Sequence, residues 1–376
     1  MLYKRLMVVG IICLAIISTG CSNNSILQFE IENSEIETQN ESQINTSTES
    51  ETEETASDEF SEAVESSENA IDLQVIKPNE LGQIMVIMYH GLGQKNGDYV
   101  RTPDSFRADL ELLYERGYRP ISMEDYINNR IDIGPGLTPF VLTFDDGSQT
   151  NFNILDEDTK EIDPNCSLGI MLELNKKYPD FIPKGIFYLT GRVSFGQAHL
   201  VEYKLNYLNE NGFEIGNHSY GHESFKNMNT SMIMESLGKN EQAILSIVPD
   251  VKIRSLSLPY GIRPNNESAY SALTFGQYGE TQYEYTSIVN VGWRPEYPSI
   301  HQKFNPFSIN RVNSGDDKFE LAYWIEHFDQ NPQNRYISDG FPNIVTIWET
   351  DLDKINLDVM GDLEIRTYIL DETQMP

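Results

Sequence analysis

Hydrophobic and polar positions follow two alternating patterns from residue 76 onward. Apolar runs of strand length recur, and between them apolar residues return at the three- and four-residue spacing of helices that bury one face. The runs predicted as strands are 84–90, 139–144, 185–190, 213–216, 253–258, 308–312 and 344–348. The segments predicted as helices are 103–117, 122–129, 168–178, 200–211, 232–248 and 318–328.

Strands that alternate with helices are typical of an α/β fold with a parallel sheet. Roughly seven such units over about 300 residues favour a distorted (β/α) barrel of about seven strands, formed by a single domain over 76–376. In such barrels the chemistry lies at the carboxyl ends of the strands. The polar residues at the predicted strand ends are His90, Asp145, Asp146, His218 and Tyr260.

The N-terminus has a different pattern. Lys4 and Arg5 precede an apolar run over 6–19, and small residues follow it, which predicts a signal peptide over 1–20. The run is too short to span a bilayer comfortably. Ser-Thr-Gly-Cys at 18–21 resembles the lipobox of bacterial lipoproteins, with Ser in place of the usual Leu.

The lipobox resemblance implies that Cys21 is acylated. The protein would then be exported and anchored to the outer face of the bacterial cell membrane through this residue. The alternative is an ordinary signal peptide with a chance cysteine. Cys13 lies within the predicted signal peptide, so Cys166 is left alone in the folded part and we expect no intrachain disulfide.

Residues 22–75 carry 15 acidic residues and no Lys or Arg. Ser, Thr, Asn and Glu dominate this segment, so it cannot bury enough apolar surface to offset chain entropy. We predict a disordered acidic linker that holds the following domain away from the membrane.

The chain as a whole has 27 Lys and Arg against 58 Asp and Glu, a net charge of −31. Nucleic-acid binding depends on neutralising phosphates with Lys and Arg, so this balance excludes a nucleic acid as the partner.

Two short motifs carry the chemical signal. His218 and His222 lie four residues apart after a predicted strand, a spacing that suits zinc, although Gly221 favours a turn over a helix. Asp145 and Asp146 end another strand, and a bend at the following glycine would let both carboxylates face one cavity. Taken separately, each motif is weak evidence, because a surface histidine pair is the favoured explanation of the first and a turn-forming Asp-Asp-Gly is a common explanation of the second.

Taken together, the motifs offer one carboxylate and two imidazoles as ligands, with a second carboxylate left free as a base. A three-ligand set with open positions is typical of catalytic rather than structural zinc. Water bound there would have its pKa drawn toward neutrality.

These residues resemble the polysaccharide deacetylases, the family 4 carbohydrate esterases with a NodB-homology domain. Thr-Phe-Asp-Asp-Gly at 143–147 is similar to the first family motif, and Asn-His-Ser-Tyr-Gly-His at 217–222 is similar to the second. Leu-Pro-Tyr-Gly at 258–261 is similar to the third. The resemblance covers roughly 80–350, essentially the whole predicted domain.

The resemblance also implies residue roles. Asp145 would be the general base, and the backbone N–H of Tyr260 would help to hold the oxyanion. Asp146, His218 and His222 would bind a divalent metal ion, for which we expect zinc.

The sequence departs from the family pattern in two places. Ser257 stands where the third motif usually has Arg, and Arg254 is out of register. The usual late Leu-x-His, which supplies the general acid, does not occur after residue 222. We interpret the remaining histidines, His199, His301 and His327, as structural or surface residues.

Deacetylases of poly-N-acetylglucosamine form a subset with permuted motifs, which open on an apolar strand that ends in Tyr-His. Met-Tyr-His-Gly at 88–91 resembles this opening, which implies that His90 is the general acid. The alternative is a strand-end histidine that satisfies loop backbone. Trp293 and Arg311 lie where the family often has pocket walls and charge partners, but ordinary packing or surface pairing is our expectation for both.

The sequence therefore predicts a metal-dependent hydrolase that removes N-acetyl groups from a cell-surface N-acetylhexosamine polymer. Poly-N-acetylglucosamine, peptidoglycan and chitin-like chains all fit, and we expect a monomer. One alternative is an O-acetyl glycan esterase that uses the same site. The other is a non-catalytic glycan-binding lipoprotein, which Ser257 in place of Arg leaves open.

Overall fold

The computed structural model describes residues 71–191 and 194–370. The predicted signal peptide, Cys21 and most of the predicted linker lie outside the described residues. Within the described ranges no helix is long and apolar enough to cross a membrane. Helix α1 (Leu73–Ile76) begins inside the segment 22–75, where Asp72 caps it by accepting from the backbone N–H of Gln74. Helical structure therefore starts a few residues before the predicted domain boundary.

The main sheet has eight parallel strands in the order β11-β8-β7-β6-β3-β1-β12, with β2 also paired to β3. Their bounds are β1 (Met85–Tyr89), β2 (Tyr118–Ile121), β3 (Thr138–Phe144), β6 (Ile186–Leu189), β7 (Glu214–Asn217), β8 (Ser255–Ser257), β11 (Ser287–Val289) and β12 (Val312–Asn313). A parallel bridge between Val289 of β11 and Ile309, just before β12, joins the two ends of the sheet. The predicted distorted barrel is confirmed.

The main sheet differs from the prediction at three strands, one of which is β2, which the pattern did not reveal. The run 344–348 forms β13 (Ile344–Trp348) as predicted, but it pairs with β14 (Glu364–Tyr368) outside the barrel. The seventh barrel strand is β11, a three-residue strand that the pattern did not reveal.

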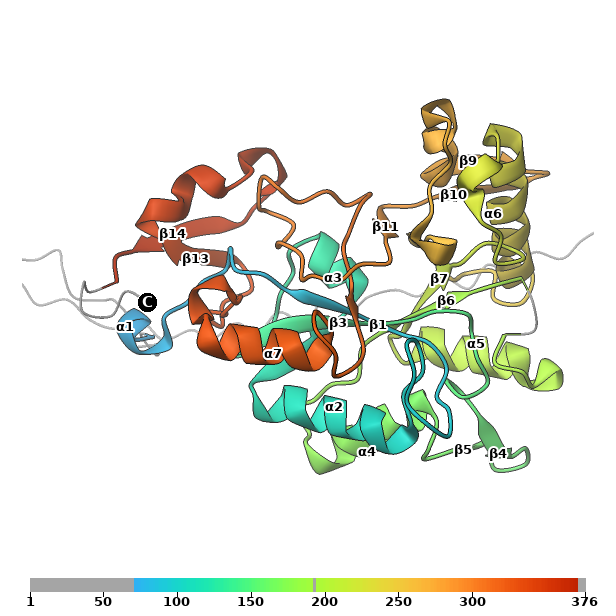
Figure 1. Cartoon of the computed structure of the whole chain (residues 1–376), viewed down its shortest axis with the longest axis horizontal. Helices are drawn as coiled ribbons and strands as arrows, with labels where there is room; N and C mark the ends of the chain where they lie inside the picture. The colour runs from blue at the N-terminus through green and yellow to red at the C-terminus, as the bar shows by residue number, and fades with distance from the viewer. Residues whose placement is uncertain (1–70, 192–193, 371–376) are drawn as a thin grey trace, which may run out of the picture. The chain divides into compact units, whose positions relative to one another are not determined.

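Helices and small hairpins complete the fold (Figure 1). The helices are α2 (Pro103–Glu115), α3 (Met123–Ile127), α4 (Ser167–Lys177), α5 (Val201–Glu210), α6 (Thr230–Leu245) and α7 (Leu321–Gln330). The hairpins pair β4 (Ile154–Asp156) with β5 (Glu161–Ile162) and β9 (Phe275–Tyr278) with β10 (Thr281–Glu284). Short 3-10 turns are η1 (Ala198–Leu200), η2 (Phe225–Asn227), η3 (Pro259–Gly261), η4 (Glu267–Leu273), η5 (Pro332–Asn334), η6 (Glu349–Lys354) and η7 (Leu357–Val359).

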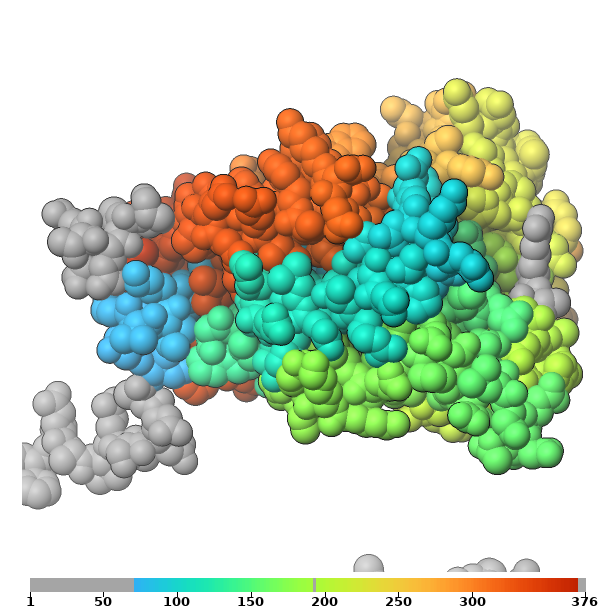
Figure 2. Space-filling model, turned by 60° about the horizontal axis from the view of Figure 1, so that its bottom comes forward, coloured from blue at the N-terminus to red at the C-terminus, as the bar shows by residue number. Residues whose placement is uncertain are grey.

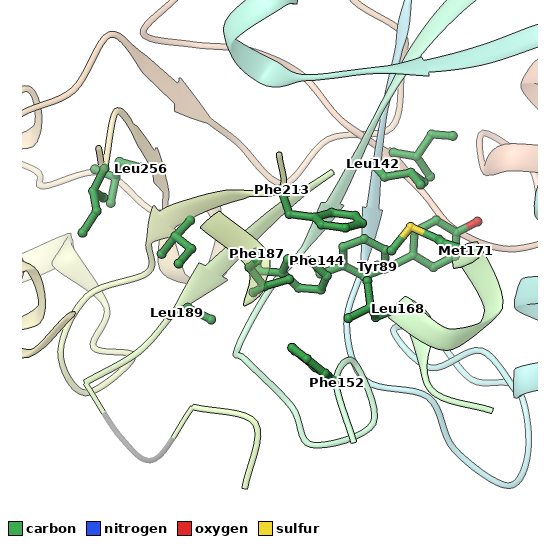
Figure 3. Packing of buried hydrophobic residues seen from close by; sticks show 14 of the residues in the cluster. Tyr89, Leu142, Phe144, Phe152, Leu168, Met171, Phe187, Leu189, Phe213 and Leu256 are labelled. Atoms are coloured by element: carbon green, nitrogen blue, oxygen red, sulfur yellow. The ribbon is translucent and has the colours of Figure 1, made fainter. Parts of the chain in front are cut away.

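Side chains along the barrel strands alternate between two cores. On β3, Phe144 faces the outer core under the helices, whereas Val141 faces the barrel interior. Tyr89, Phe144 and Phe187 from three neighbouring strands stack in the outer core, with ring centroids 5.8 Å and 4.8 Å apart (Figure 3). Because Asp145 follows Phe144, the same alternation directs its side chain into the barrel.

Candidate active site and metal centre

The predicted site residues all follow the carboxyl ends of barrel strands. His90 follows β1, Asp145 follows β3, His218 follows β7, and Tyr260 lies just beyond β8. The N–H of Asp145 donates to the carbonyl oxygen of Tyr89 at 2.9 Å, so Asp145 lies beside the strand end that carries His90. Because the carboxyl ends of parallel barrel strands gather at one mouth, residues far apart in the sequence share one site.

A buried ion pair holds Asp145. The Arg311 guanidinium donates to both of its carboxylate oxygens, each at 2.8 Å, and both side chains are almost fully buried. Burial alone would raise the pKa of Asp145, but the adjacent charge and hydrogen bonds of Arg311 hold it well below its usual range. Asp145 is therefore an ionised carboxylate, the form that can accept a proton.

Arg311 is the charge partner of Asp145, a role that the family pattern would give to an Arg at position 257. The Ser257 hydroxyl donates to Asp145 at 3.1 Å and lies 3.2 Å from an Arg311 nitrogen. The expectation of ordinary packing or surface pairing for Arg311 was wrong, because the side chain is fully buried inside the barrel. Arg311 and Asp145 are 166 residues apart, so only barrel closure brings them together. The signal in the sequence was the position of Arg311 in the predicted strand 308–312, where the family often has a charge partner.

Asp146, His218 and His222 form a cluster of possible metal ligands. One Asp146 oxygen lies 3.5 Å from Nε2 of each histidine, and the three donor atoms all lie within 4.8 Å of one another. Asp146 has a φ of 74° and His222 a φ of 57°, both in the left-handed region. The bend therefore begins at Asp146 itself rather than at Gly147, and this turns its carboxylate toward the site. Such backbone strain is concentrated at functional sites.

Hydrogen bonding sets the orientation of His218. Its Nδ1 donates to the carbonyl oxygen of Ser257 at 2.8 Å, which leaves Nε2 facing Asp146. Burial opposes a charge on His218, but the carboxylates of Asp145 and Asp146 outweigh burial and raise its pKa. The carboxylates of Asp145 and Asp146 thus favour a positive charge beside His218. One carboxylate and two imidazoles with this polarity fit a divalent metal ion.

His90 and Tyr260 are the other two predicted site residues at this mouth of the barrel. His90 is half-buried, and its Nδ1 has no hydrogen-bond partner among the described residues. Burial lowers the pKa of His90, while the carboxylates of Asp145 and Asp146 oppose that change. The Tyr260 backbone has a φ of 59°, and its ring centroid is 4.5 Å from that of His222.

The remaining histidines lie outside this cluster. His301 is buried, with its ring 4.1 Å from that of Tyr297, and His199 contacts Glu157 on the surface. His327 packs among the aromatic side chains of α7. Cys166 is buried and caps α4, where its sulfur accepts from the Gly169 N–H at 3.3 Å. These placements agree with structural or surface roles.

The barrel mouth thus holds one carboxylate and two imidazoles beside an arginine-bound aspartate. This set of residues is typical of hydrolases. Residues 176–277 match the model of the polysaccharide deacetylase family, which confirms the resemblance drawn from the motifs. The matched segment includes His218, His222 and Tyr260, whereas Asp145 and Asp146 precede it. The match supports an enzyme that deacetylates glycans. No curated protein matches the sequence.

Solved structures of several deacetylases are similar to the chain. Deacetylase PplD of Streptococcus pyogenes, solved with acetate, is 16% identical, with a TM-score of 0.48 over 65% of this chain and 98% of that one. IcaB of Ammonifex degensii is 17% identical, with a TM-score of 0.47 over 65% and 97%. The polysaccharide deacetylase BC0361 of Bacillus cereus is 15% identical, with a TM-score of 0.48 over 65% and 69%.

Proposed function

We propose that this protein is a metal-dependent deacetylase that removes N-acetyl groups from a cell-surface N-acetylhexosamine polymer. The observation that carries the proposal is the position of Asp145. Arg311 holds it as a carboxylate, and one of its oxygens lies 4.0 Å from Nε2 of His218, within the cluster of metal donors. A proton acceptor thus lies next to the atoms that would hold a metal ion.

Asp146, His218 and His222 would hold the divalent ion, and zinc is the ion that we expect. When bound, a metal of this kind supplies Lewis-acid polarisation of the acetyl carbonyl and lowers the pKa of water.

The protein's own residues would carry the proton transfers. Asp145 accepts the proton of the attacking water, because its ion pair with Arg311 keeps it ionised. The Tyr260 N–H donates to the oxygen of the tetrahedral intermediate. His90 donates a proton to the departing nitrogen as the C–N bond breaks. The products are acetate and a free amine.

Arg311 also bears on the non-catalytic alternative. That interpretation depended on the missing Arg at 257, and Arg311 supplies a guanidinium to Asp145 from another strand. The N-acetyl assignment is supported by His90, because a departing amine needs a proton more than a departing alcohol does.

Anchoring belongs to the same proposal. Cys21 and the acidic segment that follows it would tether the enzyme to the outer face of the cell membrane, where a surface polymer is within reach. Mass spectrometry of the protein purified from membranes, with a Cys21→Ser variant as control, would detect the acyl chains.

Acetate release tests the activity. The substrates are β-1,6- and β-1,4-linked N-acetylglucosamine oligomers and, for comparison, O-acetylated xylan. We expect zinc-dependent release from an N-acetylated oligomer, reduced about a thousandfold in Asp145→Asn. Asp156→Asn, an exposed carboxylate on β4, serves as the matched control and keeps full activity. Wild-type rates in Asp145→Asn would contradict the base assignment, and release from O-acetylated xylan alone would favour the esterase.

A further inference from the structure

Three exposed aromatic side chains follow consecutive strands around the mouth of the barrel. Tyr99 is 48% exposed, Trp293 67% and Phe319 39%, and they lie on the loops after β1, β11 and β12. The segment 309–313, which includes β12, pairs with β11 on one side and β1 on the other, so these loops are neighbours. The metal donors come from the loops after β3 and β7. We call Tyr99, Trp293 and Phe319 the aromatic arc.

Hydrogen bonds hold the arc in place. The indole N–H of Trp324 donates to the carbonyl oxygens of Trp293, at 3.0 Å, and Phe319, at 3.2 Å, so one side chain binds both loops. The Asn313 side chain donates to the carbonyl oxygen of Asp98 at 2.8 Å and ties the Tyr99 loop to β12.

An ion pair adds a second tie between the same loops. Arg101, at the end of the Tyr99 loop, contacts Asp316 at 3.0 Å. The blue-cyan loop after β1 and the orange segment around α7 lie side by side in Figure 2. Because the loops are already fixed, binding a ligand there costs little further ordering.

Tyr99 adjoins the site directly, and the loop that carries Trp293 packs against the segment that carries Tyr260. The ring of Tyr99 is 5.1 Å from that of His90. At the other end, Gly261, next to Tyr260, packs so closely on Val291 that an added Cβ would lie 2.9 Å from its side chain, two residues before Trp293. Exposed apolar side chains that gather into a patch mark a binding surface, and the hydrogen bonds above hold the loops of the arc together. The flat aromatic rings of the arc can stack on the uncharged, apolar C–H faces of sugar rings.

We propose that the aromatic arc binds the sugar units that flank the acetylated unit in a polysaccharide chain. The enzyme therefore acts within a chain and uses short oligomers poorly. This inference deepens the proposed function and rests on it, since it identifies the substrate as an extended acetylated glycan.

Chain-length dependence tests the proposal. We expect kcat/KM to rise from the dimer to the pentamer of N-acetylglucosamine in the wild type. Phe319→Ala and Trp293→Ala each lower the pentamer value about fivefold and lower the dimer value by a smaller factor. Phe275→Ala is the matched control, because Phe275 is 58% exposed on the β9–β10 hairpin, which packs against α6. Equal use of dimer and pentamer, or wild-type values in both arc variants, would overturn the proposal.

A binding measurement separates this inference from the proposed activity. Calorimetry of the pentamer uses Asp145→Asn, alone and combined with Trp293→Ala or Phe319→Ala. Weaker binding in the combined variants supports the arc, even if no variant releases acetate and the deacetylase proposal fails. Binding that does not weaken, or no binding of the pentamer at all, overturns it. A third result would also overturn the proposal: the arc variants lose binding to anionic lipid vesicles while their binding of the pentamer is unchanged. The arc would then be a membrane-binding surface.

Discussion

Replacing Arg311 by Met tests whether the buried pair with Asp145 organises the site. The change removes two hydrogen bonds of 2.8 Å and leaves a carboxylate inside the barrel, where the two side chains are 0% and 3% exposed. Removing one partner of a buried ion pair costs roughly 3–5 kcal/mol. In a domain of about 300 residues that lowers the melting temperature by roughly 5–8 °C.

A double-mutant cycle gives the coupling directly. Asp145→Asn costs less, about 1–2 kcal/mol, because Arg311 keeps the Thr143 hydroxyl and the Asn290 carbonyl oxygen as acceptors. We expect the double variant to be more stable than the sum of the single changes predicts, by about 2 kcal/mol.

The assay is denaturant unfolding of chelator-treated protein, so that no metal ion contributes to the difference. Arg107→Met is the matched control, because its pair with Glu173 is partly exposed and changes stability by less than about 1 kcal/mol. Single effects that add to within about 0.5 kcal/mol would refute the coupling between Asp145 and Arg311.

Three further predictions concern Ser257, His90 and Glu80. Ser257→Arg restores the usual family residue, but we expect it to lower stability because Arg311 already fills that space. Adding Arg311→Ser to Ser257→Arg is expected to regain stability. Denaturant unfolding curves of the single and double variants test both expectations. His90→Ala lowers kcat about a hundredfold on an N-acetylated substrate while zinc affinity is unchanged, and an unchanged rate would count against its role as acid. Burial, with help from Asp339, raises the pKa of Glu80 from 4.5 to about 8. Because the pKa of Glu80 is higher in the folded than in the unfolded protein, the free energy of unfolding falls as the pH rises from about 4.5 to about 8. We expect Glu80→Gln to flatten this fall. An equally steep fall in Glu80→Gln would contradict the role of Glu80.

The sequence predicts those parts of the site that depend on local pattern. An apolar run that ends in a polar residue marks a strand end, and this placed His90, Asp145, His218 and Tyr260 at the mouth of the barrel. The prediction of a barrel depended only on the alternation of strands with helices along the chain.

Features that depend on distant contacts were not predicted. Arg311 meets Asp145 only after the barrel closes, and no local pattern records that pairing. The strand β11 has three residues, too few for a period to show, and β13 has a clear strand pattern but finds its partner outside the barrel. The left-handed backbone at Asp146 was not predicted either, because Asp adopts this region only occasionally and the adjacent Gly147 was the more obvious position for the bend.

Zinc binding tests most directly the claim that the strand-end loops build a metal centre. Chelator-treated protein is titrated with zinc in a calorimeter, with the wild type beside His218→Ala. We predict one tight site in the wild type and its loss in the variant, because His218 Nε2 is one of three donor atoms within 4.8 Å of one another. The absence of a tight site in the wild type, or the same affinity in His218→Ala, would contradict it.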